Sequence, residues 1–370
     1  MKLSDVRLLV KAEWFLVLSL ATCVAFLLFG PQLLAGLDQL VRLGLIFAWL
    51  FVIILGSALA VVRHADHIAE RLGEPYGTII LTLSITAIEV ISITAIMLHG
   101  DNNPTLARDT LFAVTMIILN GMVGLSLLMG GWKHHEQNYN LQGANAYLGV
   151  VIPLGVLALV MPNFTTSTSG PTLSFAQETF LAVISVVLYV SFLALQTRRH
   201  RSYFAGTSDG SHASPRPASL RGLPTHIVLL LAYMVPVVYL AEKLAHPVDY
   251  VVETMGQPAA LAGLAMAVLV ATPEAVGAVR AARANQMQRS VNIFLGSVLS
   301  TIGLTIPAIL IISHATLHPI TLGLQHTDLA LFLLTLTLCL VTFSSGRTNI
   351  MQGGVHLVLF LCYLFFMFQG

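Results

Sequence analysis

Two glutamates, Glu89 and Glu274, lie inside long apolar stretches of this 370-residue sequence. Of its 17 aspartate and glutamate residues, only these two fall well inside segments that could cross a lipid bilayer. Ionisable side chains are costly in hydrocarbon and usually mark a path for ions or protons. The pattern therefore predicts a buried carboxylate site that handles cations.

The sequences that lead up to the two glutamates resemble each other. GEPYGTIILTLSITAIEV (73–90) and GQPAALAGLAMAVLVATPEA (256–275) each combine Gly-x-Pro, an apolar run, and a glutamate with a threonine just before it. Each glutamate is followed by a polar loop with an arginine, Arg108 or Arg289, and then by another apolar stretch with small and polar residues. The chain therefore contains two related segments, each with one acid.

Pro273 directly precedes Glu274. A proline inside a helix removes a backbone donor and distorts the helix, so we expect an interruption there whose freed carbonyl oxygens could act as ligands. A single intramembrane glutamate can instead be a protonated residue that packs against a neighbouring helix. We favour an ion site because the two acids occupy matching places.

The composition is that of an integral membrane protein. Hydrophobic residues make up 56% and charged residues 9% of the chain, whereas soluble domains carry about 25% charged residues. The apolar stretches approach the ~20 residues that span a bilayer as a helix and lack the alternation of a transmembrane barrel. We expect an all-α membrane protein with about eleven spans, at 13–36, 41–62, 77–98, 110–130, 145–162, 176–196, 226–241, 258–279, 291–313, 328–345 and 355–369.

The basic residues predict the orientation of these spans. With a cytoplasmic N-terminus, all but three of the 18 lysine and arginine residues (Arg42, Arg108 and Lys243) fall on the cytoplasmic side, as the positive-inside rule requires. The C-terminus is then periplasmic. Six spans precede and five follow a Ser-, Gly-, Pro- and Arg-rich linker. Spans 2–6 and spans 7–11 are five each, and because five is odd the second group is inverted relative to the first. Inverted repeats form ion sites near the bilayer midplane in many secondary transporters.

Several motifs, in order, resemble the ChaA-type calcium/sodium–proton antiporters, in the cation/proton exchanger branch of the calcium–cation antiporter superfamily. The motifs are VVRHADHIAERLGEPYG (61–77), the Glu89 helix, LVATPEAVGAV (269–279), NQMQRSVNIFLGSVLSTIGLTIP (285–307) and SSGRTN (344–349). The resemblance implies a bacterial inner-membrane protein with one peripheral helix and two inverted five-helix repeats. The domains expected are a peripheral helix at 1–40, a first repeat at 41–197, a cytoplasmic basic linker at 198–225 and a second repeat at 226–370.

In that family one acid from each repeat forms a central cation site, which implies Glu89 and Glu274 here. Helices that follow the acids supply polar groups, for which Asn120 and Ser300 match. Two carboxylates balance one Ca²⁺, two Na⁺ or two protons, and Ca²⁺ takes about six to eight oxygen ligands. Burial favours the protonated form of a carboxyl group, so protons compete with the metal. Further hydroxyl ligands are expected from Ser84, Thr86 and Thr272.

The predicted function is therefore a secondary antiporter that exports Ca²⁺, and Na⁺ as a further cargo, in exchange for protons by alternating access. Its expected partners are inorganic cations, protons and the lipid bilayer, with no cofactor and no nucleic acid. An Na⁺/H⁺ or K⁺/H⁺ exchanger with little calcium transport is the first alternative. A second is an intramembrane enzyme, but HHEQN (134–138) lacks the second histidine of a zinc protease motif.

Three further polar residues, His64, Asp66 and His67, lie at the predicted cytoplasmic end of the second span. Histidine titrates near neutral pH, so this group could sense pH. Ordinary interfacial polarity is the alternative. Two histidines three residues apart are weak evidence for a transition-metal site.

Overall fold

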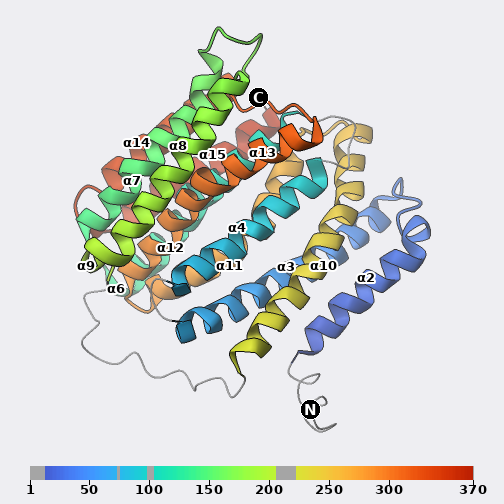
Figure 1. The fold of residues 1–370 in the computed structure, drawn as a ribbon, viewed down its shortest axis with the longest axis horizontal. Helices are drawn as coiled ribbons and strands as arrows, with labels where there is room; N and C mark the ends of the chain where they lie inside the picture. Colours follow the sequence, from blue (N-terminus) through green and yellow to red (C-terminus); the bar gives the residue numbers. More distant parts are fainter. Residues whose placement is uncertain (1–12, 73–75, 98–103, 206–221, 370) are drawn as a thin grey trace. The chain divides into compact units, whose positions relative to one another are not determined.

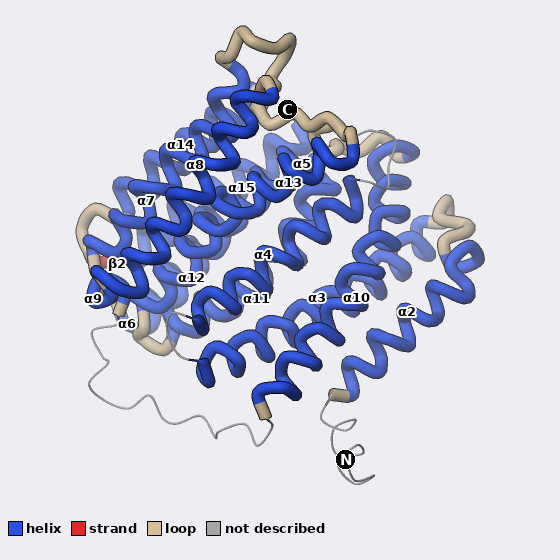
Figure 2. The backbone as a smooth tube through the Cα atoms, in the orientation of Figure 1, coloured by secondary structure: helices blue, strands red, loops and turns tan. Residues whose placement is uncertain are grey.

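The computed structural model describes residues 13–72, 76–97, 104–205 and 222–369, and nearly all of them are helical (Figures 1 and 2). The only strands in these ranges are β1 (Gln137–Asn138) and β2 (Arg347–Thr348), which form one short antiparallel pair. Nine of the described helices are long and apolar enough to cross a membrane, and two shorter apolar helices lie at Thr82–Ala95 and His326–Thr342. Each predicted span therefore coincides with a helix, and the all-α membrane class is confirmed.

The first of two compact units comprises Met1–Asp101 and Ser219–Gln257. Within it, α3 and α10 pack against each other along much of their length, and both contact α4, while α2 packs against α3 and α10 (Figure 1). The helices of this unit are α2 (Trp14–Leu33), α3 (Leu40–Leu72), α4 (Tyr76–Met97), α10 (Leu223–Asp249) and the π-helical η5 (Tyr250–Thr254). This unit carries Glu89, on α4.

The second unit comprises Asn102–Ala218 and Pro258–Gly370. Its helix α11 packs against α5, α6 and α12, and α15 packs against α6. Its helices are α5 (Leu106–Met116), η1 (Ile117–Met122), α6 (Val123–His134), α7 (Leu141–Gly155), η2 (Val156–Val160), η3 (Met161–Asn163), α8 (Phe175–Ala194), η4 (Leu195–Arg199), α9 (Arg201–Phe204), α11 (Ala260–Arg283), α12 (Met287–Ser300), η6 (Thr301–Thr305), α13 (Ile306–Thr316), α14 (His326–Thr342) and α15 (Ile350–Gln369). This unit carries Glu274, on α11.

The expected interruption of the helix at Pro273 is not present. α11 is a continuous α-helix from Ala260 to Arg283, with Pro273 inside it. The proline removes one backbone N–H, so the carbonyl of Leu269 lacks its usual donor. We attribute the unbroken helix to packing, because three neighbouring helices hold α11 and Pro273 itself is buried among them.

Two spans of the second unit are instead interrupted by π-helical turns, whereas the π-helical η2 and η4 follow the ends of α7 and α8. η1 separates α5 from α6 and contains Asn120, and η6 separates α12 from α13 directly after Ser300. Such turns frequently occur at functional sites. These are the spans that follow Glu89 and Glu274 in the sequence, so the two related segments share a second feature that neither apolar pattern indicated.

Glycines let helices of the second unit approach closely. A Cβ atom at Gly353 on α15 would lie 2.5 Å from the backbone nitrogen of Leu128 on α6. A Cβ at Gly263 on α11 would lie 2.7 Å from the backbone nitrogen of Thr110 on α5. Small residues have this role in many transmembrane helix interfaces. The packing around α11 and α15 therefore depends on the absence of side chains at these positions.

Candidate ion-binding site

In the second unit, the Glu274 carboxylate contacts the neighbouring helix α12. The hydroxyl of Ser297 donates a hydrogen bond to Oε2 of Glu274. Glu274 is half-buried and Ser297 is buried, so this contact is partly shielded from water. A hydroxyl that donates to a carboxylate still has lone pairs that can face a cation. The pair therefore offers oxygen atoms from two helices at one point.

Two hydroxyls predicted to support the site lie close to this pair in the chain but bond to backbone. Ser300 donates to the carbonyl oxygen of Ser297 at 2.8 Å, and Thr272 donates to the carbonyl oxygen of Val268 at 2.5 Å. Their roles as ligands stay predictions. The residue in direct contact with Glu274 is Ser297, which the sequence places one helical turn before Ser300 and directly after Gly296.

In the first unit, Glu89 on α4 is 1% exposed. Thr86 lies three residues earlier, on the same face of the helix, and is also buried. Within the described part of the chain, the Thr86 hydroxyl has no hydrogen-bond partner, whereas the Ser84 hydroxyl donates to the carbonyl oxygen of Ile80 at 2.7 Å. A buried hydroxyl without a partner is unfavourable unless a ligand or water satisfies it. The Thr94 hydroxyl on α4 is also buried without a partner among the described residues, but Thr86 lies one helical turn from Glu89 and is therefore the better placed of the two to share a cation with that acid.

Asn120 in η1 is completely buried in the second unit. Its Nδ2 donates to Oγ1 of Thr335 on α14 at 2.8 Å, and its Oδ1 lies 3.3 Å from Nδ1 of His356 on α15. Nε2 of His356 lies 2.9 Å from Oγ1 of Thr342. The amide thus ties three helices together, and its role as a cation ligand stays a prediction. His356 and Thr335 could have been found as polar residues inside apolar spans.

The group His64, Asp66 and His67 lies on α3 in the first unit. The structure brings both histidines to His226 on α10: Nδ1 of His64 is 3.0 Å from Nδ1 of His226, and the rings of His67 and His226 are 4.8 Å apart. Asp66 lies between them in the sequence and is half-buried. Among the residues that the structure describes, no three His, Cys, Asp or Glu side chains are arranged to hold a metal ion.

Comparison with known proteins agrees with this architecture. The profile of the sodium/calcium exchanger protein family matches residues 43–198 and 225–369, which leaves out the expected linker. The chain is 41% identical to the putative ionic transporter y4hA of Sinorhizobium fredii over 315 residues, 84% of each chain. It is 39% identical to the sodium-potassium/proton antiporter ChaA of Escherichia coli over 322 residues, 85% of this chain and 86% of the relative.

Two solved structures have the same fold. The structure of native YfkE has a TM-score of 0.74 at 21% identity and covers 96% of this chain and 100% of its own. The H⁺/Ca²⁺ exchanger CAX has a TM-score of 0.66 at 16% identity and covers 96% of this chain and 88% of its own. Together with the family match, these likenesses confirm the resemblance seen in the sequence. The chain belongs to the sodium/calcium exchanger family and is a cation/proton antiporter of the membrane, not an enzyme.

Proposed function

We propose that Glu89 and Glu274 bind the exported cation and the incoming protons in alternation, with Ca²⁺ as the principal cargo and Na⁺ as a second one. The observation that carries the proposal is that each compact unit holds one glutamate inside an apolar helix, beside a hydroxyl group. Ser297 contacts Glu274, and Thr86 lies one turn from Glu89. Carboxylate and hydroxyl oxygens are the ligands that hard cations such as Ca²⁺ and Na⁺ take.

The charge of the pair explains the exchange. Two ionised carboxylates balance one Ca²⁺ or two Na⁺, and two protons neutralise the same groups. An ionised and empty site is costly to expose to the hydrocarbon region. The site therefore passes from one side of the membrane to the other only when a cation or protons occupy it. With a proton gradient directed inward, protons enter and the cation leaves.

A second candidate is exchange of Na⁺ or K⁺ for protons with little calcium transport. It is supported by the 39% identity to a relative named as a sodium-potassium/proton antiporter, against 24% identity to a Bacillus subtilis relative named as a Ca²⁺/H⁺ antiporter. Both candidates use the same two glutamates. They differ in the cation that drives proton release.

The test uses everted membrane vesicles from a host without its own exchangers. Respiration acidifies the interior, Ca²⁺, Na⁺ or K⁺ is added in turn, and a pH-sensitive dye reports proton release. We expect release with Ca²⁺ and Na⁺ in the wild type, and none in Glu89→Gln or Glu274→Gln. Glu136→Gln, which changes an exposed loop glutamate, serves as the matched control and keeps the wild-type rate.

Normal exchange by either glutamine variant would overturn the assignment of the two glutamates. Release with Na⁺ and K⁺ but not with Ca²⁺ would favour the second candidate. Immunoblots of the vesicles establish equal insertion of all variants, so that a loss of exchange is a loss of function and not of protein.

We also propose that the protein lies in a bacterial inner membrane with a cytoplasmic N-terminus and a periplasmic C-terminus. The distribution of basic residues supports this orientation. A C-terminal alkaline phosphatase fusion should be active and a C-terminal fluorescent-protein fusion dark, because each reporter folds in only one of the two compartments. The reverse result would place the C-terminus in the cytoplasm.

A further inference from the structure

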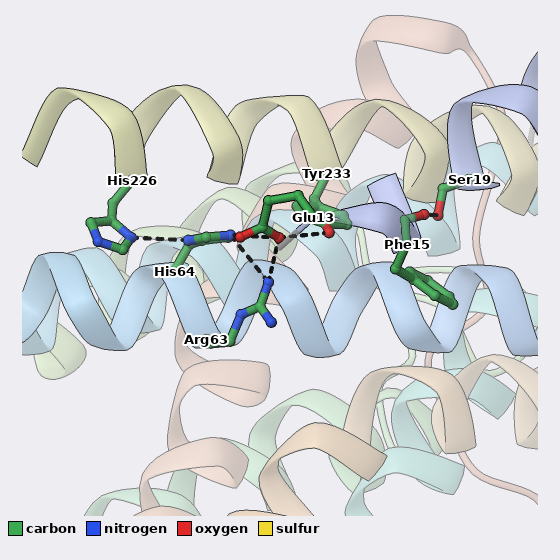
Figure 3. Close-up of polar contacts among 7 residues, drawn as sticks. All are labelled: Glu13, Phe15, Ser19, Arg63, His64, His226 and Tyr233. Atoms are coloured by element: carbon green, nitrogen blue, oxygen red, sulfur yellow. Dashed lines mark hydrogen bonds and ion pairs between the residues drawn. The ribbon is translucent and has the colours of Figure 1, made fainter. Parts of the chain in front are cut away.

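Five side chains from three elements of the first unit meet in one buried cluster (Figure 3). Arg63 and His64 come from α3, His226 and Tyr233 from α10, and Glu13 directly precedes α2. Oε2 of Glu13 accepts hydrogen bonds from Nη2 of Arg63 at 2.7 Å and from the Tyr233 hydroxyl at 2.9 Å. We call this cluster the histidine brace.

The brace is shielded from water on most sides. Glu13, His64, His226 and Tyr233 are all at most 5% exposed, whereas the Arg63 side chain is half exposed. A change of charge inside the brace therefore cannot be compensated by solvent and has to be met by the surrounding side chains. Of the five side chains, that of Arg63 is the one open to bulk water.

The two histidines face each other through their Nδ1 atoms. Their Nδ1 atoms are 3.0 Å apart, which requires one to carry a proton and the other a lone pair. Nη2 of Arg63, which can only donate, lies 3.4 Å from Nε2 of His64. We therefore assign the proton of neutral His64 to Nδ1, from which it is donated to His226.

This arrangement limits how many protons the pair can hold. One added proton leaves an imidazolium that donates to an imidazole, and Oε2 of Glu13, 3.7 Å from Nε2 of His64, stabilises its charge. A second added proton places two N–H groups opposite each other at Nδ1. The contact between α3 and α10 at this point is then lost.

The charged and titratable groups of the brace come from three elements. Glu13 precedes α2, Arg63, Asp66 and His67 lie on α3, and Tyr233 lies on α10. The helix α4, which packs against α3 and α10, carries Glu89. Glu13 and Arg63 offset each other in charge, and the His67 ring lies tilted beside the His226 ring. The net charge of the brace therefore changes with the protonation of His64 and His226.

We infer that the histidine brace is a proton-operated regulator of antiport, separate from the protons that the antiporter carries. With neutral histidines the brace joins α2, α3 and α10, and with both histidines protonated the contact between α3 and α10 at this point is lost. Both helices pack against α4, which carries Glu89. The protonation state of the brace thus changes the packing of the helix that bears one of the two proposed cation-binding acids.

The test separates regulation from cargo competition by using saturating cation. Purified protein in liposomes is assayed for cation flux at equal pH on both sides, from about pH 5.5 to 8. Protons that compete at the transport site raise the KM, whereas the brace changes the maximal rate. We expect the wild-type maximal rate to change about threefold or more over this range, and His226→Gln to be nearly flat.

Two controls identify the cause. His135→Asn changes an exposed histidine whose positive φ of 61° suits asparagine, and it keeps the wild-type profile. Tyr233→Phe removes a contact to Glu13 but leaves both histidines, so the pH transition persists even where the absolute rate changes. A wild-type profile in His226→Gln, or a flat profile in Tyr233→Phe, would overturn the inference.

A direct measurement covers the case in which His226→Gln does not fold. ¹⁵N NMR of histidine-labelled wild-type protein reports the imidazole nitrogens, and the signals of the His64–His226 pair should change over the pH range in which the maximal rate changes. Nitrogens that keep one state throughout would overturn the inference. So would a pH profile that disappears with a chelator, since that would make the group a metal site. None of these outcomes depends on whether Ca²⁺, Na⁺ or K⁺ is the cargo.

Discussion

Ser297 on α12 donates a hydrogen bond to the Glu274 carboxylate on α11, so a hydroxyl of one helix fixes the orientation of the acid on another. Ser300, three residues further along, instead donates to the carbonyl oxygen of Ser297. The two serines therefore have different relationships to the acid, and substitutions can separate them.

Ser297→Ala should weaken cation binding more than Ser300→Ala. The first change removes a hydrogen bond to a charged group, which contributes about 1.5–3 kcal/mol, so the KM for the cation should rise about tenfold or more. Ser300→Ala removes only a bond to backbone and should change the KM much less. Cation-dependent proton release over a range of concentrations measures both, and equal effects would assign the two hydroxyls the same role.

Thr86→Val should raise the KM for the cation without loss of stability. The Thr86 hydroxyl is buried and has no partner within the described part of the chain, so an apolar side chain of the same shape is tolerated in the packing. The matched control is Ser84→Ala, whose hydroxyl already bonds to its own helix. An unchanged KM, with a higher melting temperature in detergent, would show that Thr86 is a packing residue and not a ligand.

Asn120→Ala should lower the melting temperature of the purified protein. It leaves Thr335 and His356 without their buried amide partner, at a cost of about 1–3 kcal/mol. His356→Ala disturbs the same network from the other side and should cost a similar amount. If Asn120 is also a cation ligand, Asn120→Ala will reduce transport well beyond His356→Ala at equal stability. Equal transport in both variants would limit Asn120 to a structural role.

Alanine substitutions at two adjacent glycines on α15 should have different effects on the stability of the protein. The Cβ of Gly353→Ala would meet the α6 backbone at 2.5 Å, and we expect a loss of about 1–3 kcal/mol. Gly354 has nothing within 4 Å of its ideal Cβ position, so Gly354→Ala should be neutral or slightly stabilising through its helix preference. Thermal unfolding in detergent compares the two, and a similar loss for both would contradict the close packing of α15 on α6.

The spans could be predicted because bilayer thickness fixes the length of an apolar helix. Their ends could not. The second span was expected at 41–62, whereas α3 runs from Leu40 to Leu72, and the seventh was expected at 226–241, whereas α10 and η5 run from Leu223 to Thr254. Hydropathy records only the apolar part of a helix, and the backbone continues beyond it through polar residues such as Arg63 and His64.

The candidate site was accessible to sequence reasoning only in part. A glutamate inside an apolar stretch is conspicuous, so Glu89 and Glu274 could be singled out. The direct contact between Ser297 and Glu274 could not be predicted from the sequence. Ser297 and Ser300 lie on one helix, and only tertiary packing decides which of the two serines faces α11. The partner of His64 was equally hidden, since His226 lies 162 residues away on another helix.

The π-helical turn η1 has a consequence for single-residue deletions. A π-helical turn holds an extra residue compared with an α-helical turn. Deletion of one residue within 117–122 would let the span close into regular α-helix while α6 keeps nearly the same face toward its neighbours, because the wide turn already absorbs the extra residue. Gly124 would then stay against Leu357 on α15. Deletion of one residue from the regular α-helix of α6 would instead rotate everything after it by about 100° about the helix axis, so the span should tolerate a shortened chain within η1 and not within α6.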